Sequence, residues 1–133
     1  MIGDNLTSSI VTKALDGVWQ RQKAVSANIA NAETPYYKAE KVTFEEELAR
    51  RVKKLGTGPD VTGKTIREGL GTIKDSEIFN YDDDYITMRL DGNNVDIDQE
   101  NVDMIKTQIQ YMYLVRSMTN MYANLEYAVK GGK

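Results

Sequence analysis

The 133-residue sequence contains no cysteine and no histidine. Without thiols or imidazoles, it lacks the usual protein ligands of zinc and the thiol nucleophile of covalent catalysis. Acid–base chemistry would depend on Asp, Glu, Lys or Tyr side chains alone. We therefore expect no catalytic residue, no bound cofactor and no metal site.

The chain also lacks an excess of positive charge and any long apolar run. Its net charge is −3, whereas a nucleic-acid-binding protein displays a basic patch or stripe. No segment offers the ~20 consecutive apolar residues of a membrane-spanning helix. Asp4, Asn5 and Lys13 interrupt any apolar core of a signal peptide. We expect no nucleic-acid partner, no membrane span and no cleavable secretion signal.

Apolar residues recur with coiled-coil spacing near the N-terminus. The spacing alternates between four and three residues and predicts a helix from about residue 5 to residue 32. Its seam, with one polar member, is Val11, Leu15, Val18, Gln22, Val25, Ile29 and Ala32. Thr34-Pro35 would end this helix, since a residue before proline avoids the helical conformation.

A second long helix is predicted from about residue 98 to residue 129. Asp98 is one choice of N-cap, and Asp96 with Gln99 as a capping box is the other. Two neighbouring apolar rows form a broad stripe on this helix: Val102, Ile105, Ile109 and Met112 in one, and Tyr111, Val115, Met118, Tyr122, Leu125 and Val129 in the other. The terminal helices can cover each other, but this stripe is wider than one partner helix. Either the middle of the chain folds over the remainder or other chains cover it.

Three segments follow from these patterns: residues 1–38, residues 39–90 and residues 91–133. In the middle segment, Thr43 and Glu46 form a capping box before a short helix over residues 43–55. The glycines between residues 56 and 71 predict a mobile loop. Residues 72–79 and 85–90 could pair as a hairpin around Asp82–Asp84. The predicted fold is mainly α, with paired terminal helices and an irregular middle.

Two motifs suggest ligands but fail on context. Residues 58–65 match the phosphate-binding loop of nucleotide hydrolases at every fixed position, but that loop needs a buried strand before it and a long helix after it. Here a charged helical segment precedes it, and Gly69 and Gly71 are expected to break a following helix. A calcium loop starting at Asp91 fails because its fifth and twelfth positions are valines.

Two segments resemble the flagellar rod and hook axial proteins. Asn28-Ile29-Ala30-Asn31, followed by Thr34-Pro35-Tyr36-Tyr37-Lys38, resembles the end of that family's N-terminal helix. Leu90–Asp96, leading into a Tyr- and Gln-bearing helix, resembles the C-terminal part of the basal-body rod members. One departure is Tyr36, where the family usually has glycine. A tyrosine with positive φ would be strained, so either the turn takes another form or Tyr36 packs outward.

The resemblance implies a structural subunit of the bacterial flagellar basal-body rod, which polymerises through its terminal helices and transmits torque for motility. It also implies export through the flagellar type III apparatus without cleavage, and assembly in the periplasm. The partners would be copies of itself, other rod proteins and the rod–ring adaptor. A generic helical adaptor, or a coiled-coil protein like a secretion needle, is the alternative, and it would need neither motif.

The predicted assembly interface combines the helix seams with the two motifs. Its residues are Val11, Leu15, Val18, Val25, Asn28, Ile29, Asn31, Thr34, Pro35, Tyr37, Lys38, Asp91, Asn93, Asn94, Ile105, Ile109, Met112, Val115, Met118, Tyr122 and Leu125.

Overall fold

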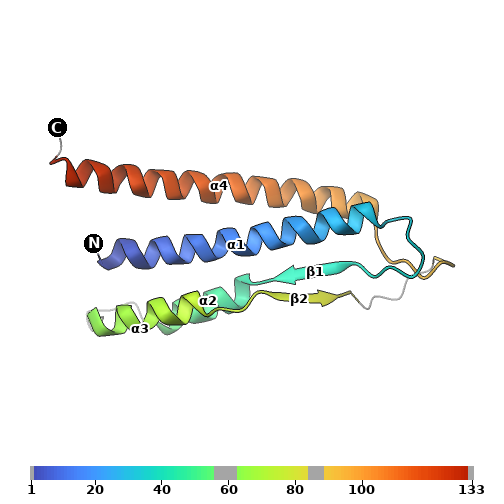
Figure 1. Cartoon of the computed structure of the whole chain (residues 1–133), viewed down its shortest axis with the longest axis horizontal. Helices are drawn as coiled ribbons and strands as arrows, with labels where there is room; N and C mark the ends of the chain where they lie inside the picture. The colour runs from blue at the N-terminus through green and yellow to red at the C-terminus, as the bar shows by residue number, and fades with distance from the viewer. Residues whose placement is uncertain (1, 56–62, 84–88, 132–133) are drawn as a thin grey trace. The chain divides into compact units, whose positions relative to one another are not determined.

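The computed structural model describes residues 2–55, 63–83 and 89–131 (Figure 1). Its elements in chain order are α1 (Ile2–Ala30), β1 (Glu40–Thr43), α2 (Glu45–Lys54), α3 (Gly63–Lys74), β2 (Phe79–Asp82) and α4 (Ile97–Val129). The predicted fold class is confirmed, since two long terminal helices flank a middle with short helices and one antiparallel strand pair.

The chain forms two compact units. One comprises Met1–Asp16, Phe44–Glu77 and Met112–Lys133, and the other Gly17–Thr43 and Ile78–Tyr111. Each unit contains residues from all three predicted segments, 1–38, 39–90 and 91–133. The three segments therefore describe the order of elements along the chain and not its compact units.

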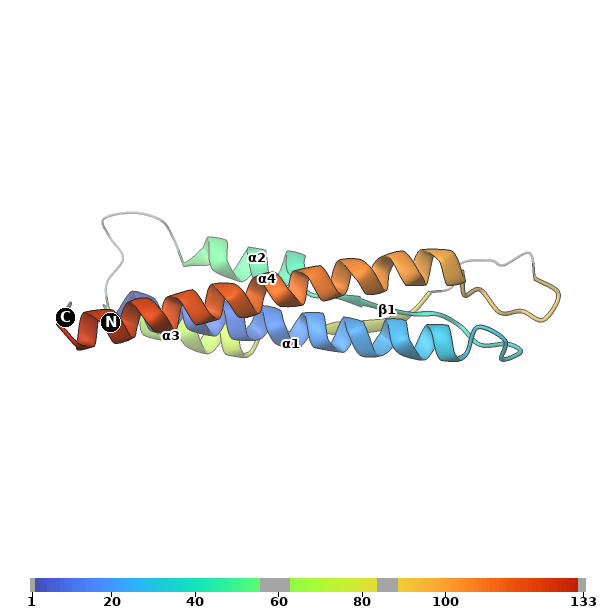
Figure 2. The same ribbon diagram turned by 90° about the horizontal axis from the view of Figure 1, so that it is seen from above.

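The unit of residues 17–43 and 78–111 holds the strand pair and the adjoining halves of α1 and α4. β1 and β2 are antiparallel, with Glu40 opposite Asp82 and Thr43 opposite Phe79. Within this unit α4 runs alongside α1 (Figure 1, Figure 2). The seam residues Val18 and Val25 are buried, as their coiled-coil spacing requires.

The other unit contains α2 and α3, which pack on each other. Ile73 of α3 is completely buried, and Arg51 of α2 donates a hydrogen bond to the Thr72 carbonyl at 2.6 Å. The expectation that the glycines prevent a helix was wrong over residues 63–71, because Gly69 and Gly71 lie inside α3. The remainder of the predicted loop, residues 56–62, is outside the described residues.

The local details of the middle segment also differ from prediction. The predicted capping box of α2 is wrong: Phe44 is the N-cap and makes no side-chain cap hydrogen bond, while Thr43 ends β1. The strand predicted over residues 72–79 is wrong, because α3 extends to Lys74 and β2 begins at Phe79. β2 pairs with β1, a strand that the periodicity missed. Residues 84–88 lie outside the described residues.

At the start of α4, Asp96 is the N-cap rather than Asp98. Its carboxylate accepts the backbone N–H groups of Asp98 at 3.0 Å and Gln99 at 3.2 Å. These two bonds satisfy amide groups that a helix start leaves unpaired. No helix in the described ranges is long and apolar enough to cross a membrane.

Candidate assembly interface

The carboxyl end of α1 is closed by a side chain from far along the sequence. Asn93 is fully buried, and its amide nitrogen donates to the carbonyl oxygens of Asn31 at 2.9 Å, Ala32 at 3.1 Å and Thr34 at 2.9 Å. Arg89 donates to the Ala32 carbonyl as well, at 3.1 Å. These carbonyls belong to the turn that follows α1, where the Thr34 N–H also donates to the Asn31 carbonyl at 2.9 Å. Asn93 and Arg89 therefore tie this turn to the segment before α4.

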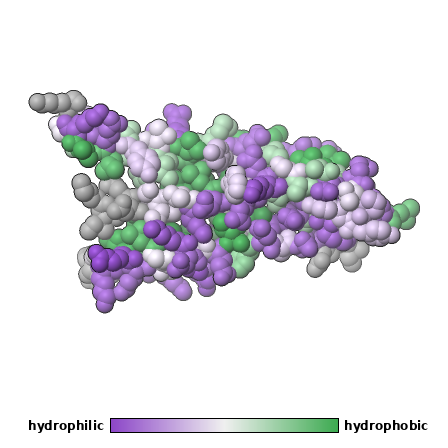
Figure 3. All heavy atoms as spheres, viewed as in Figure 1, coloured by the Kyte–Doolittle hydropathy of each residue, from purple (hydrophilic) through white to green (hydrophobic). Residues whose placement is uncertain are grey.

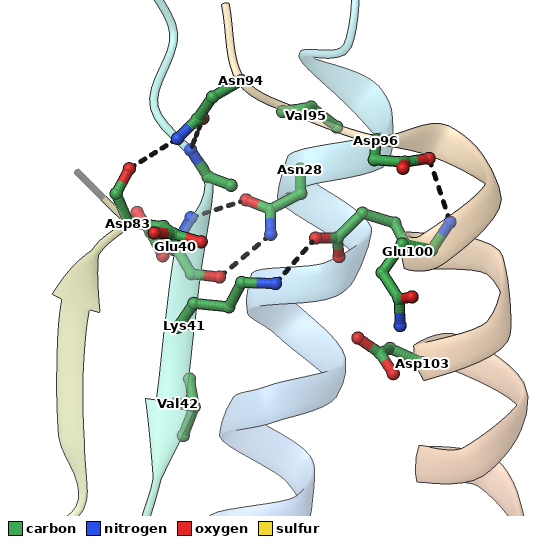
Figure 4. A network of polar contacts seen from close by, with 12 residues as sticks. Asn28, Glu40, Lys41, Val42, Asp83, Asn94, Val95, Asp96, Glu100 and Asp103 are labelled. Carbon is green, nitrogen blue, oxygen red and sulfur yellow. Dashed lines mark hydrogen bonds and ion pairs between the residues drawn. The ribbon is translucent and has the colours of Figure 1, made fainter. Parts of the chain in front are cut away.

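Two further asparagines hold β1 in place (Figure 4). The Asn28 amide donates to the Glu40 carbonyl at 2.9 Å, and its oxygen accepts the Glu40 backbone N–H at 2.8 Å. Asn28 therefore pairs with the strand backbone as a neighbouring strand would. The Asn94 oxygen accepts the Ala39 N–H at 2.8 Å, and its amide donates to the Asp83 carbonyl.

Tyr37 completes this group of side chains, because its hydroxyl donates to the Asn28 oxygen at 3.2 Å. Burial, followed by the nearby Glu40 carboxylate, raises the pKa of Tyr37 above its ordinary value. The hydroxyl therefore stays protonated and available as a donor. We call the set Asn28, Asn31, Tyr37, Asn93 and Asn94 the asparagine clasp.

A strained turn lies beside the clasp. Tyr36 has a φ of +63° and is 81% exposed. Its backbone N–H donates to the Asp91 carbonyl at 2.8 Å. Of the two alternatives anticipated for this position, the first is wrong, because the turn keeps the positive φ, and the second is confirmed, because the ring lies outward. Its Cδ1 atom would lie 3.1 Å from a Cβ added to Gly92, whose φ is also positive.

Asp91 is the acidic centre of this turn. Arg89 donates to its carboxylate at 2.8 Å and 3.2 Å, and the Asn93 N–H donates to it at 3.1 Å. The hydrogen bond from Arg89 is the main reason why the pKa of Asp91 lies below its usual value. The ionised carboxylate thus orients the backbone on which Asn93 sits.

A groove lies between α1, β1 and α4. Arg21 of α1 crosses it, donating to the Val42 carbonyl at 3.0 and 3.2 Å and to Gln110 at 3.4 Å. The groove encloses about 200 Å³, below the ~300 Å³ of small-molecule sites. Its full lining is Arg21, Ala24, Val25, Glu40, Lys41, Val42, Thr43, Tyr81, Glu100, Asp103, Lys106, Thr107 and Gln110.

Charged groups on the groove are paired across its walls. The Glu100 side chain is 3% exposed and lies 3.6 Å from the Lys41 ammonium (Figure 4). Burial alone would raise the pKa of Asp103, but hydrogen bonds from Gln99 and Lys106 outweigh it and hold that pKa below its usual range. No group of three or more potential metal ligands occurs within residues 2–55, 63–83 and 89–131.

The apolar stripe predicted on α4 is largely open to solvent. Val102 is 47% exposed, Ile105 58%, Ile109 57% and Met112 62%. We call these four residues the exposed row. In the space-filling view, apolar side chains lie among polar ones on the visible face (Figure 3).

The predicted interface residues divide by burial. Val18, Val25, Asn28 and Asn93 are buried within the chain itself. Half-buried are Val11, Leu15, Ile29, Asn31, Tyr37, Lys38, Asp91, Asn94, Met118 and Leu125. Exposed are Thr34, Pro35, Ile105, Ile109, Met112, Val115 and Tyr122. The structure thus brings the two motif segments together in the clasp and leaves part of the α4 stripe uncovered.

Sequence reasoning missed the groove. Lys41 and Glu100 belong to no pattern in the sequence, and no contact was predicted for Arg21. A glutamate in the first turn of a helix is ordinarily a solvated partner of the helix dipole. The one sequence feature that could have indicated the groove is Glu100, a charged residue on the side of α4 that faces α1, where an apolar residue would be usual.

Related proteins match this chain over most of its length. No family model matches. The chain is 32% identical over 113 residues to the flagellar basal body rod protein FlgB of Bacillus subtilis (strain 168), covering 85% of this chain and 84% of the relative. It is 30% identical over 133 residues to FlgB of Borrelia hermsii, covering 94% and 96%, and 29% identical to FlgB of Borreliella burgdorferi, covering 87% and 90%.

The fold and these relatives define a class: a helical structural protein of the bacterial flagellar basal body. Within that class, the chain belongs to the family of the flagellar basal body rod protein FlgB. The resemblance seen in the clasp segments is therefore confirmed across most of the chain.

Proposed function

We propose that this chain is a polymerising subunit of the proximal rod, and that it associates through its terminal helices to transmit torque for motility. The observation that carries the proposal is the exposed row on α4. Four large apolar side chains on one face of a helix expose enough apolar surface to favour association. Contacts between unlike patches that do not close produce a filament, which a rod requires.

The proposal includes where and with what the chain assembles. It is exported through the flagellar type III apparatus without a cleavable signal and assembles in the periplasm. Its partners are other copies, other rod proteins and the rod–ring adaptor. The names of its relatives describe a rod component, which supports a structural role without catalysis, cofactor or metal.

The predicted interface residues take two roles in this proposal. The exposed members contact neighbouring subunits directly, with Ile105, Ile109 and Met112 at the centre. The clasp members, with Asn28 and Asn93 fully buried, act indirectly, because they fix the end of α1 and the start of α4. A generic coiled-coil adaptor has no need of such a clasp, which favours the rod subunit.

Replacing Ile109 with aspartate tests the proposal. Ile109 is 57% exposed, so Ile109→Asp should leave the isolated chain folded. A charge within a desolvated contact is costly, and we expect loss of rod assembly and of motility. Gln108→Asp is the matched control, because it adds the same charge one position away at an exposed site. Normal motility of the Ile109→Asp strain would refute the proposed interface.

A further inference from the structure

We propose that Tyr36 of one copy inserts into the groove between α1, β1 and α4 of the next copy. This inference rests on the proposed function, because it names one specific contact of the polymer. Two features of the same compact unit support it: the strained, exposed ring of Tyr36 and a groove of about 200 Å³. Folding of a single chain accounts for neither of them.

The first feature is the position of Tyr36 itself. Among the described residues, it is the only non-glycine residue with positive φ. At such a φ the Cβ atom lies too close to the backbone, a strain that glycine avoids. The ring recovers little of this within the chain, since it remains 81% exposed. A strained residue kept at the surface points to a contact beyond the chain.

The second feature is the groove, whose size and lining suit one aromatic side chain. Ala24, Val25 and Val42 give it an apolar floor. Arg21, Lys41 and Gln110 place polar groups at its walls. A tyrosine has an apolar ring and a polar tip, so the ring can cover the floor while the hydroxyl meets a donor or an acceptor.

Charge around the two features is compatible with this contact. Glu33, exposed and three residues before Tyr36, gives its turn an unburied negative charge. Lys106, with a side chain 62% exposed, lies at the edge of the groove and is paired with Asp103 at 3.1 Å. Because the ring and the groove are different patches of one unit, the contact is heterologous and repeats in one direction.

Tyr36→Gly should stabilise the isolated chain, because it relieves the strain, and should weaken self-association, because it removes the ring. The melting temperature of the isolated chain should rise by roughly 2–5 °C. Self-association, measured by sedimentation of the concentrated chain, should weaken about tenfold or more, as for an anchoring aromatic residue. Tyr36→Phe keeps both ring and strain, so its melting temperature should be unchanged and its association should stay within a few-fold of wild type.

A photoreactive benzoyl-phenylalanine at position 36 then identifies the partner surface. Illumination of the assembled chain should give intermolecular adducts within residues 21–25, 40–43 or 103–110. Adducts elsewhere, no adducts, or unchanged association of Tyr36→Gly would overturn the inference.

Ile109→Asp separates this inference from the proposed function. If Tyr36→Gly assembles normally while Ile109→Asp does not, the Tyr36 contact is wrong and the polymerising subunit stands. If Ile109→Asp assembles normally, the exposed row is not the interface, whereas groove adducts from position 36 would still support the Tyr36 contact. A wild-type chain that never self-associates would overturn both.

Discussion

Asn93 shows how much of this fold depends on one side chain. Its amide nitrogen serves three carbonyl oxygens, and its own oxygen accepts the Val95 N–H at 2.7 Å. No hydrophobic residue of similar volume could satisfy these groups, and a buried carbonyl without a partner is costly. The side chain is therefore selected for its hydrogen-bonding geometry rather than for its volume.

Asn93→Ala should consequently lower the free energy of unfolding by about 2–3 kcal/mol, since it removes the buried amide that joins the turn after α1 to the segment before α4. Asn101→Ala is the matched control: Asn101 is exposed on α4, and alanine favours a helix slightly. Urea denaturation of both variants measures the difference. Equal stability of the two would show that the cap contributes nothing.

Asp91 gives the clasp a pH dependence of known sign. Its pKa in the folded chain lies below the ordinary 3.8, so the ionised form stabilises the fold at pH values above 3.8. That contribution disappears as the pH falls through the lowered folded-state pKa. The clasp should therefore weaken only under strongly acidic conditions.

Arg89→Gln removes the main cause of that shift. An NMR titration should find the pKa of Asp91 raised towards its ordinary value. Lys38→Gln is the control, because Lys38 donates to the Gly92 carbonyl at 2.9 Å rather than to the Asp91 carboxylate. The same pKa in wild type and Arg89→Gln would refute the assignment of its cause.

At the scale of elements, local patterns succeeded where the determining contacts are local. The four-three spacing of α1 and α4 is a property of neighbouring residues, and both helices were predicted within a few positions. The strand β1 was missed because Asn28 and Arg21 bind its backbone from another element. Sequence periodicity contains no signal for such side-chain-to-backbone pairing.

Helix α3 shows why a composition rule failed. Glycine costs about 1 kcal/mol in a helix, which predicted a loop. Gly69 nevertheless has a packing reason, because a Cβ there would overlap the Leu55 side chain and force it to shift. The close approach of α3 to the end of α2 offsets the intrinsic preference of glycine, and tertiary packing of this kind cannot be read from local sequence.

Two alanine substitutions separate the effect of helix propensity from the effect of packing against Leu55. Gly71→Ala should stabilise the chain by about 0.5–1 kcal/mol, since nothing lies within 4 Å of the added Cβ and helix propensity improves. Gly69→Ala should destabilise it by about 1–3 kcal/mol, because Leu55 must move. Thermal unfolding of the two variants measures both. If Gly69→Ala were as stable as Gly71→Ala, α2 and α3 would not pack as described.

For the whole molecule, the apolar stripe of α4 contains half-buried residues, which contribute to folding, and exposed residues, which are available for association. The sequence predicted one broad stripe and left open whether the chain or its neighbours cover it. The structure shows a mixed outcome: Met118 and Leu125 are half-buried, while the exposed row and the other members of the second row are open. Only tertiary structure could divide the stripe, because both rows have the same hydrophobic character.

Leu125→Asp and Ile109→Asp should therefore behave differently. Leu125→Asp places a charge at a half-buried site and should lower the stability of the isolated chain by about 1–3 kcal/mol. Ile109→Asp should change that stability by less than about 0.5 kcal/mol. Circular dichroism of dilute samples during urea titration makes the comparison. Equal destabilisation would mean that the exposed row is covered by the chain itself.

The long-range closure of α1 also sets an order of events. Asn93 and Ala32 are 61 positions apart, so a chain that emerges from its N-terminus displays α1 long before the residue that closes it. Until then the turn after α1 lacks the amide that fixes its carbonyl groups. Contacts with such sequence separation form late and slowly. The hydrogen bonds that fix the end of α1 therefore form only after the last third of the chain is present, and that end of α1 is less ordered until then.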